Sequence, residues 1–137
     1  MNYQMARPYF PEDEINWLLE EFKNILQGNA PLSMGSRVKE FEGTFANYVG
    51  ADYAVGTNSC TAALEIALRS IGIQKGDEVI IPAETFIATG SAVVSEGATP
   101  VFCDINPKSF CIGLNELKKQ VTEKTKAVII VHMAGMI

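Results

Sequence analysis

The sequence predicts an α/β fold: a mainly parallel sheet covered by helices in three layers, α/β/α. From residue 51 onward, short apolar runs alternate with helix-length segments, whereas residues 1–50 carry two helical apolar stripes. Parallel strands joined by crossover helices produce this alternation. We therefore expect residues 1–137 to be the amino-terminal, incomplete part of one large domain, with a helical segment 1–50 and a βαβ region 51–137.

Two helices are expected in the first fifty residues. Acidic residues 12–14 precede apolar residues at helical spacing, and Gly28 ends this first stripe. Residues 29–35 contain proline, serine and glycine and predict a loop. A second stripe covers residues 38–49 and is closed by Gly50.

Four short apolar runs predict strands, and the segments between them are long enough for crossover helices. The strands are expected at residues 53–55, 78–81, 100–103 and 127–131, and the helices at residues 61–71, 86–95 and 114–121. Gly72 and Gly97 stand where two of these helices end, which favours a left-handed conformation there. Because no helix follows the fourth run to cover it, we expect a truncated chain or an interrupted reading frame.

Composition argues against several classes of protein. A net charge of -5 and a pI near 4.8 disfavour nucleic acid as a partner. No apolar run approaches the roughly 20 residues that span a bilayer, and the first residues lack a secretory signal, so a cytoplasmic protein is expected. Cys60, Cys103 and Cys111 are odd in number and lack CxxC spacing, which indicates reduced thiols and no metal site.

The first candidate binding segment, residues 56–61, follows the first predicted strand. Its small polar residues open a helix, so unpaired backbone amides, with the hydroxyls of Ser59 and Thr61, can bind an anion such as phosphate. The alternative is an ordinary helix cap by Asn58 or Ser59. The segment matches neither a Walker A loop nor a GxGxxG fingerprint.

Three further candidates follow the other predicted strands. Phe86 either stacks on a flat heteroaromatic ring or anchors its helix to the sheet, and Glu84 and Thr85 either contact a ligand or cap that helix. Asp104 indicates a turn or a cap residue. His132 is the single histidine, and we interpret it as a hydrogen-bonded structural residue and assign no catalytic role to it.

Five blocks of the sequence, taken together, resemble one known family. They are residues 35–50, 56–64, 82–89, 97–104 and 131–135. In this order they are similar to the DegT/DnrJ/EryC1/StrS family, the sugar aminotransferases of the fold-type I pyridoxal-phosphate superfamily, and the resemblance covers nearly the whole chain.

The resemblance implies that the backbone around Ser59, Cys60 and Thr61 holds the phosphate of pyridoxal 5′-phosphate and that Phe86 stacks on its pyridine ring. Cys60 stands where the family usually has glycine or alanine, which leaves the backbone amides available. The family's aspartate that pairs with the pyridine nitrogen and its cofactor-anchoring lysine lie farther along the chain and are absent here. The resemblance therefore supplies no catalytic residue, and we expect these residues alone to be inactive.

For an intact relative, the resemblance implies amino transfer from glutamate or a similar donor to a keto group of a nucleotide-linked sugar, by a homodimer. Two alternatives stay open: a sugar dehydratase of the same family, and a short noncatalytic binding or interaction protein with this fold. A nucleotide phosphate is the alternative ligand at the same turn.

Overall fold

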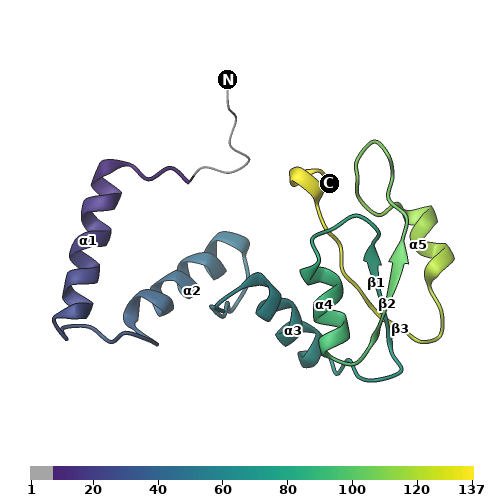
Figure 1. Cartoon of the computed structure of the whole chain (residues 1–137), viewed down its shortest axis with the longest axis horizontal. Coiled ribbons are helices and arrows are strands. Elements are labelled where there is room, and N and C mark those ends of the chain that lie inside the picture. Colours follow the sequence, from purple (N-terminus) through teal and green to yellow (C-terminus); the bar gives the residue numbers. More distant parts are fainter. Residues whose placement is uncertain (1–7) are drawn as a thin grey trace. The chain divides into compact units, whose positions relative to one another are not determined.

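The computed structural model describes residues 8–137, and the chain forms two compact units, residues 1–56 and 57–137 (Figure 1). The expectation of a single domain that changes character at residue 50 stays a prediction. The first unit contains α1 (Glu12–Leu26) and α2 (Ser36–Val49). The second contains α3 (Cys60–Ser70), β1 (Glu78–Pro82), α4 (Ala88–Ser95), β2 (Thr99–Cys103), α5 (Leu114–Gln120), β3 (Thr125–Val128) and the short 3₁₀ turn η1 (Met133–Gly135).

Both helices predicted in the first fifty residues are confirmed. The acidic first turn of α1 complements the positive end of the helix dipole. Gly50 follows α2 with a φ of 71°, a left-handed conformation that glycine adopts without steric cost. Gly50 therefore ends α2, as its position at the close of the apolar stripe predicts.

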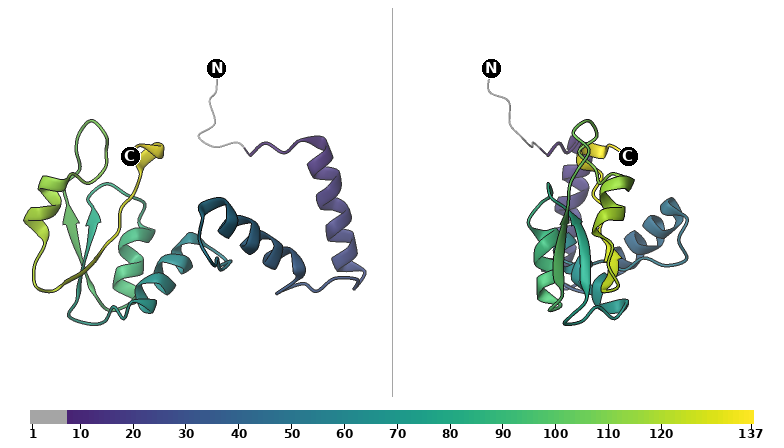
Figure 2. Two further views of the ribbon diagram at one scale, coloured as in Figure 1. Left: turned by 180° about the vertical axis from the view of Figure 1, so that it is seen from behind. Right: turned by 90° about the vertical axis from the view of Figure 1, so that its right-hand side faces the viewer.

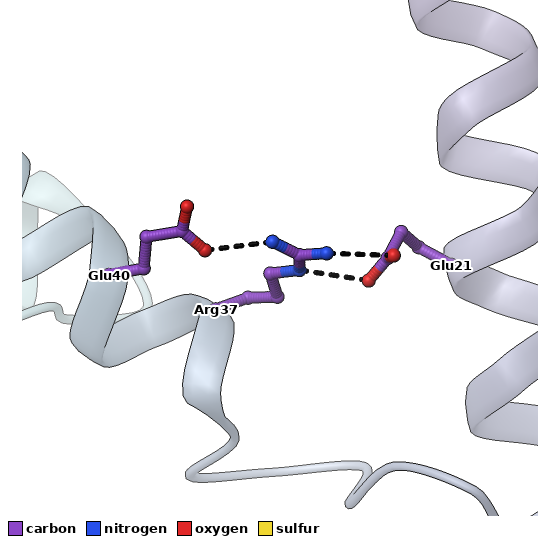
Figure 3. Close-up of polar contacts among 3 residues, drawn as sticks. All are labelled: Glu21, Arg37 and Glu40. Carbon is purple, nitrogen blue, oxygen red and sulfur yellow. Dashed lines mark hydrogen bonds and ion pairs between the residues drawn. The ribbon is translucent and has the colours of Figure 1, made fainter.

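An arginine links the two helices of the first unit (Figure 3). The Arg37 guanidinium donates two hydrogen bonds to the Glu21 carboxylate, at 2.9 and 2.8 Å, and a third to Glu40 at 2.8 Å. It also lies 5.3 Å from the centre of the Trp17 ring. Fork-shaped pairing of this kind favours one direction as well as one distance, so Arg37 connects α1 to α2 in a defined geometry.

The second unit is built on the parallel sheet that the sequence predicts. The strand order is β2-β1-β3, and both neighbours run parallel to β1. Ile80 in the central strand lies opposite Val101 on one side and Val128 on the other. All three strands therefore end at the same edge of the sheet, where ligands of open α/β folds bind.

Helices cover both faces of this sheet, with α4 on one side and α5 on the other (Figures 1 and 2). The core lies on the α3 and α4 side, where Leu68 and Val93 pack against Val79 and Ile81 of β1. Burial of these side chains removes apolar surface from water and fixes α3 and α4 on the sheet. Gly72 and Gly97 both adopt the left-handed conformation expected at their helix ends, with φ of 77°.

The strand predicted at residues 53–55 is wrong. Tyr53 and Val55 are 89% and 80% exposed, and no strand among residues 8–137 pairs with them. A strand needs a hydrogen-bonding neighbour. The chain is held to α2 here instead, because the Gly56 amide donates to a carboxylate oxygen of Glu42 at 2.7 Å.

Two predicted boundaries also need correction. The fourth strand is β3, Thr125–Val128, and not 127–131, although the Ile129 amide still donates to the Ile80 carbonyl at 2.9 Å. The helix predicted from residue 86 begins at Ala88. Residues 129–132 and 85–87 are thereby left outside regular structure, at the edge where the strands end.

Candidate functional site

The turn before α3 forms a helix cap, which is one of the two roles expected for it, beside anion binding. Ser59 has an extended backbone, and its hydroxyl oxygen accepts a hydrogen bond from the Ala62 amide at 3.2 Å. The Thr57 hydroxyl donates to the Ser59 carbonyl at 3.0 Å. Ser59, and not Asn58, is therefore the capping residue. It forms hydrogen bonds with Thr57 before it and Ala62 after it.

This cap leaves two backbone donors of α3 for another group. Within residues 8–137, no acceptor is found for the amides of Cys60 and Thr61. They lie at the positive end of an 11-residue helix. Unpaired amides at a helix start are a common binding site for phosphate, because the dipole adds to the hydrogen bonds.

Phe86 follows β1 and projects into solvent. It is 76% exposed, which excludes the interpretation in which it anchors its helix to the sheet. When a flat ligand covers an aromatic ring that is exposed to this extent, apolar surface is removed from water, which favours binding. Phe86 is therefore available for stacking.

Thr85 shapes the turn before α4. Its hydroxyl shares a hydrogen bond of 2.9 Å with the hydroxyl of Thr89, which is buried. The residue before α4 is Ile87, and α4 has no side-chain cap, so neither Glu84 nor Thr85 caps it. Thr85 instead fixes the path of the chain beside Phe86.

The start of α3, the turn after β1 and the chain beyond β3 enclose one pocket of about 530 Å³. Cys60 and Thr61 line it from α3, Thr85 and Phe86 from the turn, and His132 from the last segment. Ser59 lies outside the lining. Three of the four residues expected to bind the cofactor are thus brought to one pocket, whose volume is typical of a cofactor site.

His132, which is interpreted from the sequence as a structural residue, lines this pocket as well. Its position directly after a predicted strand was the available signal, since ligands bind at that edge. Asp104 and Glu84, which also follow strands, line a separate pocket of about 580 Å³ with Glu116 and Lys119. The strand ends therefore serve two different concavities.

The three cysteines differ in their exposure to solvent. Cys103 and Cys111 are buried and Cys60 is exposed, and none forms a disulfide. Burial raises the pKa of the Cys103 thiol, and the nearby carboxylates of Asp104 and Glu116 raise it further. Cys103 and Cys111 are therefore small buried residues with free thiols.

Two features are absent from the described range. No cluster of three or more potential metal ligands occurs within residues 8–137. No helix in that range has the length and apolar character needed to cross a membrane.

The pocket fits a phosphate attached to a flat ring. Amides without acceptors lie at one wall and an exposed aromatic ring at another. Within residues 8–137, no lysine contributes to the lining. The lining is therefore compatible with the phosphate and the ring of pyridoxal phosphate, and among the described residues it includes no lysine amine.

The chain is similar in sequence to known proteins. Spore coat polysaccharide biosynthesis protein SpsC of Bacillus subtilis is 49% identical over 104 residues, which cover 76% of this chain and 27% of that protein. dTDP-4-dehydro-2,3,6-trideoxy-D-glucose 4-aminotransferase of Saccharopolyspora spinosa is 34% identical over 133 residues, covering 96% of this chain and 33% of the enzyme.

The fold agrees with solved structures as well. NtdA of Bacillus subtilis, determined with the cofactor PMP bound, superimposes with a TM-score of 0.85 at 32% identity, over 97% of this chain and 33% of NtdA. The chain thus spans about a third or less of the length of these relatives. Residues 12–137 match the model of the DegT/DnrJ/EryC1/StrS aminotransferase family. Because this match covers nearly the whole chain, the chain belongs to the DegT/DnrJ/EryC1/StrS aminotransferase family.

Proposed function

We propose that this chain binds pyridoxal 5′-phosphate as part of an aminotransferase that acts on a keto group of a nucleotide-linked sugar. The observation that carries the proposal is that Cys60, Thr61 and Phe86 line one pocket although they come from different elements. The chain supplies the phosphate-binding and ring-binding part of the site.

Each residue has a distinct task in this proposal. The amides of Cys60 and Thr61 hold the phosphate at the start of α3, with Ser59 maintaining the helix start that presents them. Phe86 covers one face of the ring and excludes water from it. When bound, the cofactor supplies an electron sink that stabilises negative charge on the carbon next to the transferred amino group.

The substrate class is supported by what the relatives are named for. The Saccharopolyspora spinosa enzyme is named as a 4-aminotransferase of a dTDP-linked dehydro sugar, and GDP-perosamine synthase of Caulobacter vibrioides is 43% identical over 105 residues. We extend this substrate class to the present chain, with an amino acid such as glutamate as the donor.

A denaturation experiment tests the cofactor assignment. Pyridoxamine 5′-phosphate is the suitable probe, since it lacks the aldehyde that would react with surface lysines. A ligand that binds only the folded state raises the unfolding temperature, so we expect a concentration-dependent increase with this probe and none with ADP or UDP. Protection by the nucleotides alone would replace the cofactor with a nucleotide phosphate at the same turn.

We further propose that residues 1–137 do not transaminate by themselves, because no lysine lines the described pocket. The chain, mixed with pyridoxal phosphate and glutamate, is expected to form 2-oxoglutarate no faster than free pyridoxal phosphate does. Faster formation would show that another amine of the chain serves in place of the lysine.

Self-association is the last part of the proposal, and the partner is a second copy of the chain. The amphipathic helix α1 has no buried residue, and it exposes the large apolar side chains of Trp17, Leu19 and Phe22. Clustered apolar surface of this kind is typical of interfaces. Size-exclusion chromatography at several concentrations is expected to give a dimer, and a monomer at all concentrations would contradict it.

A further inference from the structure

The segment beyond β3 holds His132 at the pocket. The Gly135 amide donates to the His132 carbonyl at 3.0 Å, and the Met136 amide donates to the Met133 carbonyl at 3.0 Å. The thiol of Cys111 donates to the carbonyl of Met136 at 3.4 Å, which ties the same segment to a buried position. His132 therefore lies at the start of a turn that is held by its own backbone hydrogen bonds and by the contact with Cys111.

The backbone of this turn is strained at a residue that also lines the pocket. Ala134 has a φ of 51°, in the left-handed region. Residues other than glycine and asparagine adopt this region at a cost in conformational energy. Such residues persist where the surroundings hold them, and they are frequent at binding sites. The strain is an independent sign that the path of residues 132–135 is constrained.

The pocket contains few side chains that can form a hydrogen bond with a ligand's ring. Apart from Thr61 and Cys60, which open α3, the polar side chains of the lining are Thr85, Thr89 and His132. The two threonine hydroxyls are already bonded to each other. Within residues 8–137, no hydrogen bond of the His132 imidazole is found, and its ring nitrogens are available.

We propose that His132 is a binding residue for the polar edge of the cofactor ring. This inference rests on the proposed function: with the phosphate at Cys60 and Thr61 and one ring face on Phe86, the polar substituents at the ring edge need a partner in the pocket. The imidazole of His132 supplies it by donating or accepting a hydrogen bond. The residue selects a ring that carries polar substituents over a plain aromatic phosphate.

A single histidine makes a direct test possible. The imidazole gives one set of ring signals in a proton–nitrogen NMR spectrum, so no assignment is needed. Adding pyridoxamine 5′-phosphate is expected to shift these signals in parallel with saturation of the site. Benzyl phosphate, which has the phosphate and a ring without polar substituents, is expected to shift them far less.

Two variants measure the contribution of the imidazole. His132→Leu is expected to weaken pyridoxamine phosphate about tenfold, the loss of one hydrogen bond, and to leave benzyl phosphate unchanged. His132→Gln keeps a hydrogen-bonding group and is expected to lie between wild type and His132→Leu. Affinities are read from the fluorescence anisotropy of the bound pyridoxamine phosphate, with benzyl phosphate measured by competition, and circular dichroism checks that each variant is folded.

The outcomes separate this inference from the proposed function. Binding of pyridoxamine phosphate to wild type with unmoved histidine signals, or with equal affinity in His132→Leu, overturns the role of His132 and leaves the cofactor assignment standing. An equal loss for both ligands in His132→Leu also overturns it, since the effect then has nothing to do with the polar edge. Absence of any binding to wild type overturns the cofactor assignment and this inference together.

Discussion

The hydroxyl oxygen of Ser59 accepts a hydrogen bond from the amide of Ala62, three residues along, at 3.2 Å. This bond uses a lone pair of the oxygen and leaves the hydroxyl proton free to be donated. Ser59 can therefore cap α3 and, at the same time, donate to an anion bound at the neighbouring amides. The two interpretations of the turn, a cap and a phosphate site, are compatible.

Two substitutions of Ser59 separate these roles. Ser59→Ala removes the cap and is expected to lower the free energy of unfolding by about 1 kcal/mol. Ser59→Asp keeps a capping oxygen and is expected to preserve stability, while its negative charge repels a phosphate at the same place. Denaturant unfolding and pyridoxamine phosphate titration of both variants check this. If Ser59→Asp binds the ligand as wild type does, the phosphate lies elsewhere.

Phe86 and Phe102 form a matched pair for testing the stacking role. Both are exposed, at 76% and 62%, but Phe102 lies on β2 and lines a different concavity. Phe86→Ala is expected to change the unfolding free energy by no more than about 0.5 kcal/mol and to weaken pyridoxamine phosphate by about three- to tenfold, the contribution of an aromatic contact.

The control variant for this prediction is Phe102→Ala, which is expected to leave the affinity unchanged. Titration of both variants by fluorescence anisotropy provides the comparison. An equal loss of affinity in the two variants would point to a general effect of exposed aromatic residues and would contradict a specific contact at Phe86.

The sequence predicts those parts of the fold whose signal is local. The apolar stripes of α1 and α2, the left-handed glycines at residues 50, 72 and 97, and the alternation of β1, α4 and β2 all follow from spacing and turn residues. The strand expected at residues 53–55 fails because pairing is not local. A three-residue apolar run has no way to indicate whether a neighbouring strand exists.

The site is predicted in part for the same reason. Local patterns indicate a helix start at Cys60 and Thr61 and an aromatic residue after a strand at Phe86, and the family resemblance supplies the expectation that they bind the cofactor; all three line one pocket. The place of His132 in the same pocket depends on how the chain turns after β3, with a left-handed Ala134 that no residue type predicts. Its position after a predicted strand indicates the binding edge of the sheet, but a histidine without a second histidine or a carboxylate near it in sequence does not indicate which role it has there.

The thiols are expected to differ in reactivity as they differ in exposure. Cys60 is exposed, whereas Cys103 and Cys111 are buried, and burial raises the pKa of Cys103, which leaves less of the reactive thiolate at a given pH. Brief treatment of the native chain with iodoacetamide is expected to label Cys60 alone, and treatment in denaturant to label all three. Peptide mass spectrometry identifies the sites.

The same labelling reports on the ligand. Pyridoxamine phosphate is expected to slow alkylation of Cys60, because that residue opens the helix which holds the phosphate. Labelling of the protein in denaturant serves as the control, since no site exists there. An unchanged rate at saturating ligand would argue against a phosphate bound at this turn.

The ion pair between α1 and α2 gives a prediction on pH. Hydrogen bonds from Arg37 hold the pKa of the Glu21 carboxyl below its ordinary value of 4.5. Partial desolvation of the carboxyl opposes this decrease, and the positive charge of Arg37 adds to it. A carboxyl with a lowered pKa in the folded state stabilises that state above its unfolded pKa, and the contribution disappears as the pH falls through the folded pKa. The stability that Glu21 adds is therefore expected at neutral pH and lost in acid below 4.5.

Carbon NMR of the Glu21 carboxyl during an acid titration measures this pKa directly. Arg37→Met is expected to return it to the ordinary value, since both the hydrogen bonds and the charge are removed. Arg37→Lys keeps the charge but loses the fork that donates two bonds to Glu21. Because hydrogen bonding is the largest cause of the shift, Arg37→Lys is expected to lose most of it. A pKa in Arg37→Lys as low as in wild type would mean that charge, and not the geometry of the fork, joins the two helices.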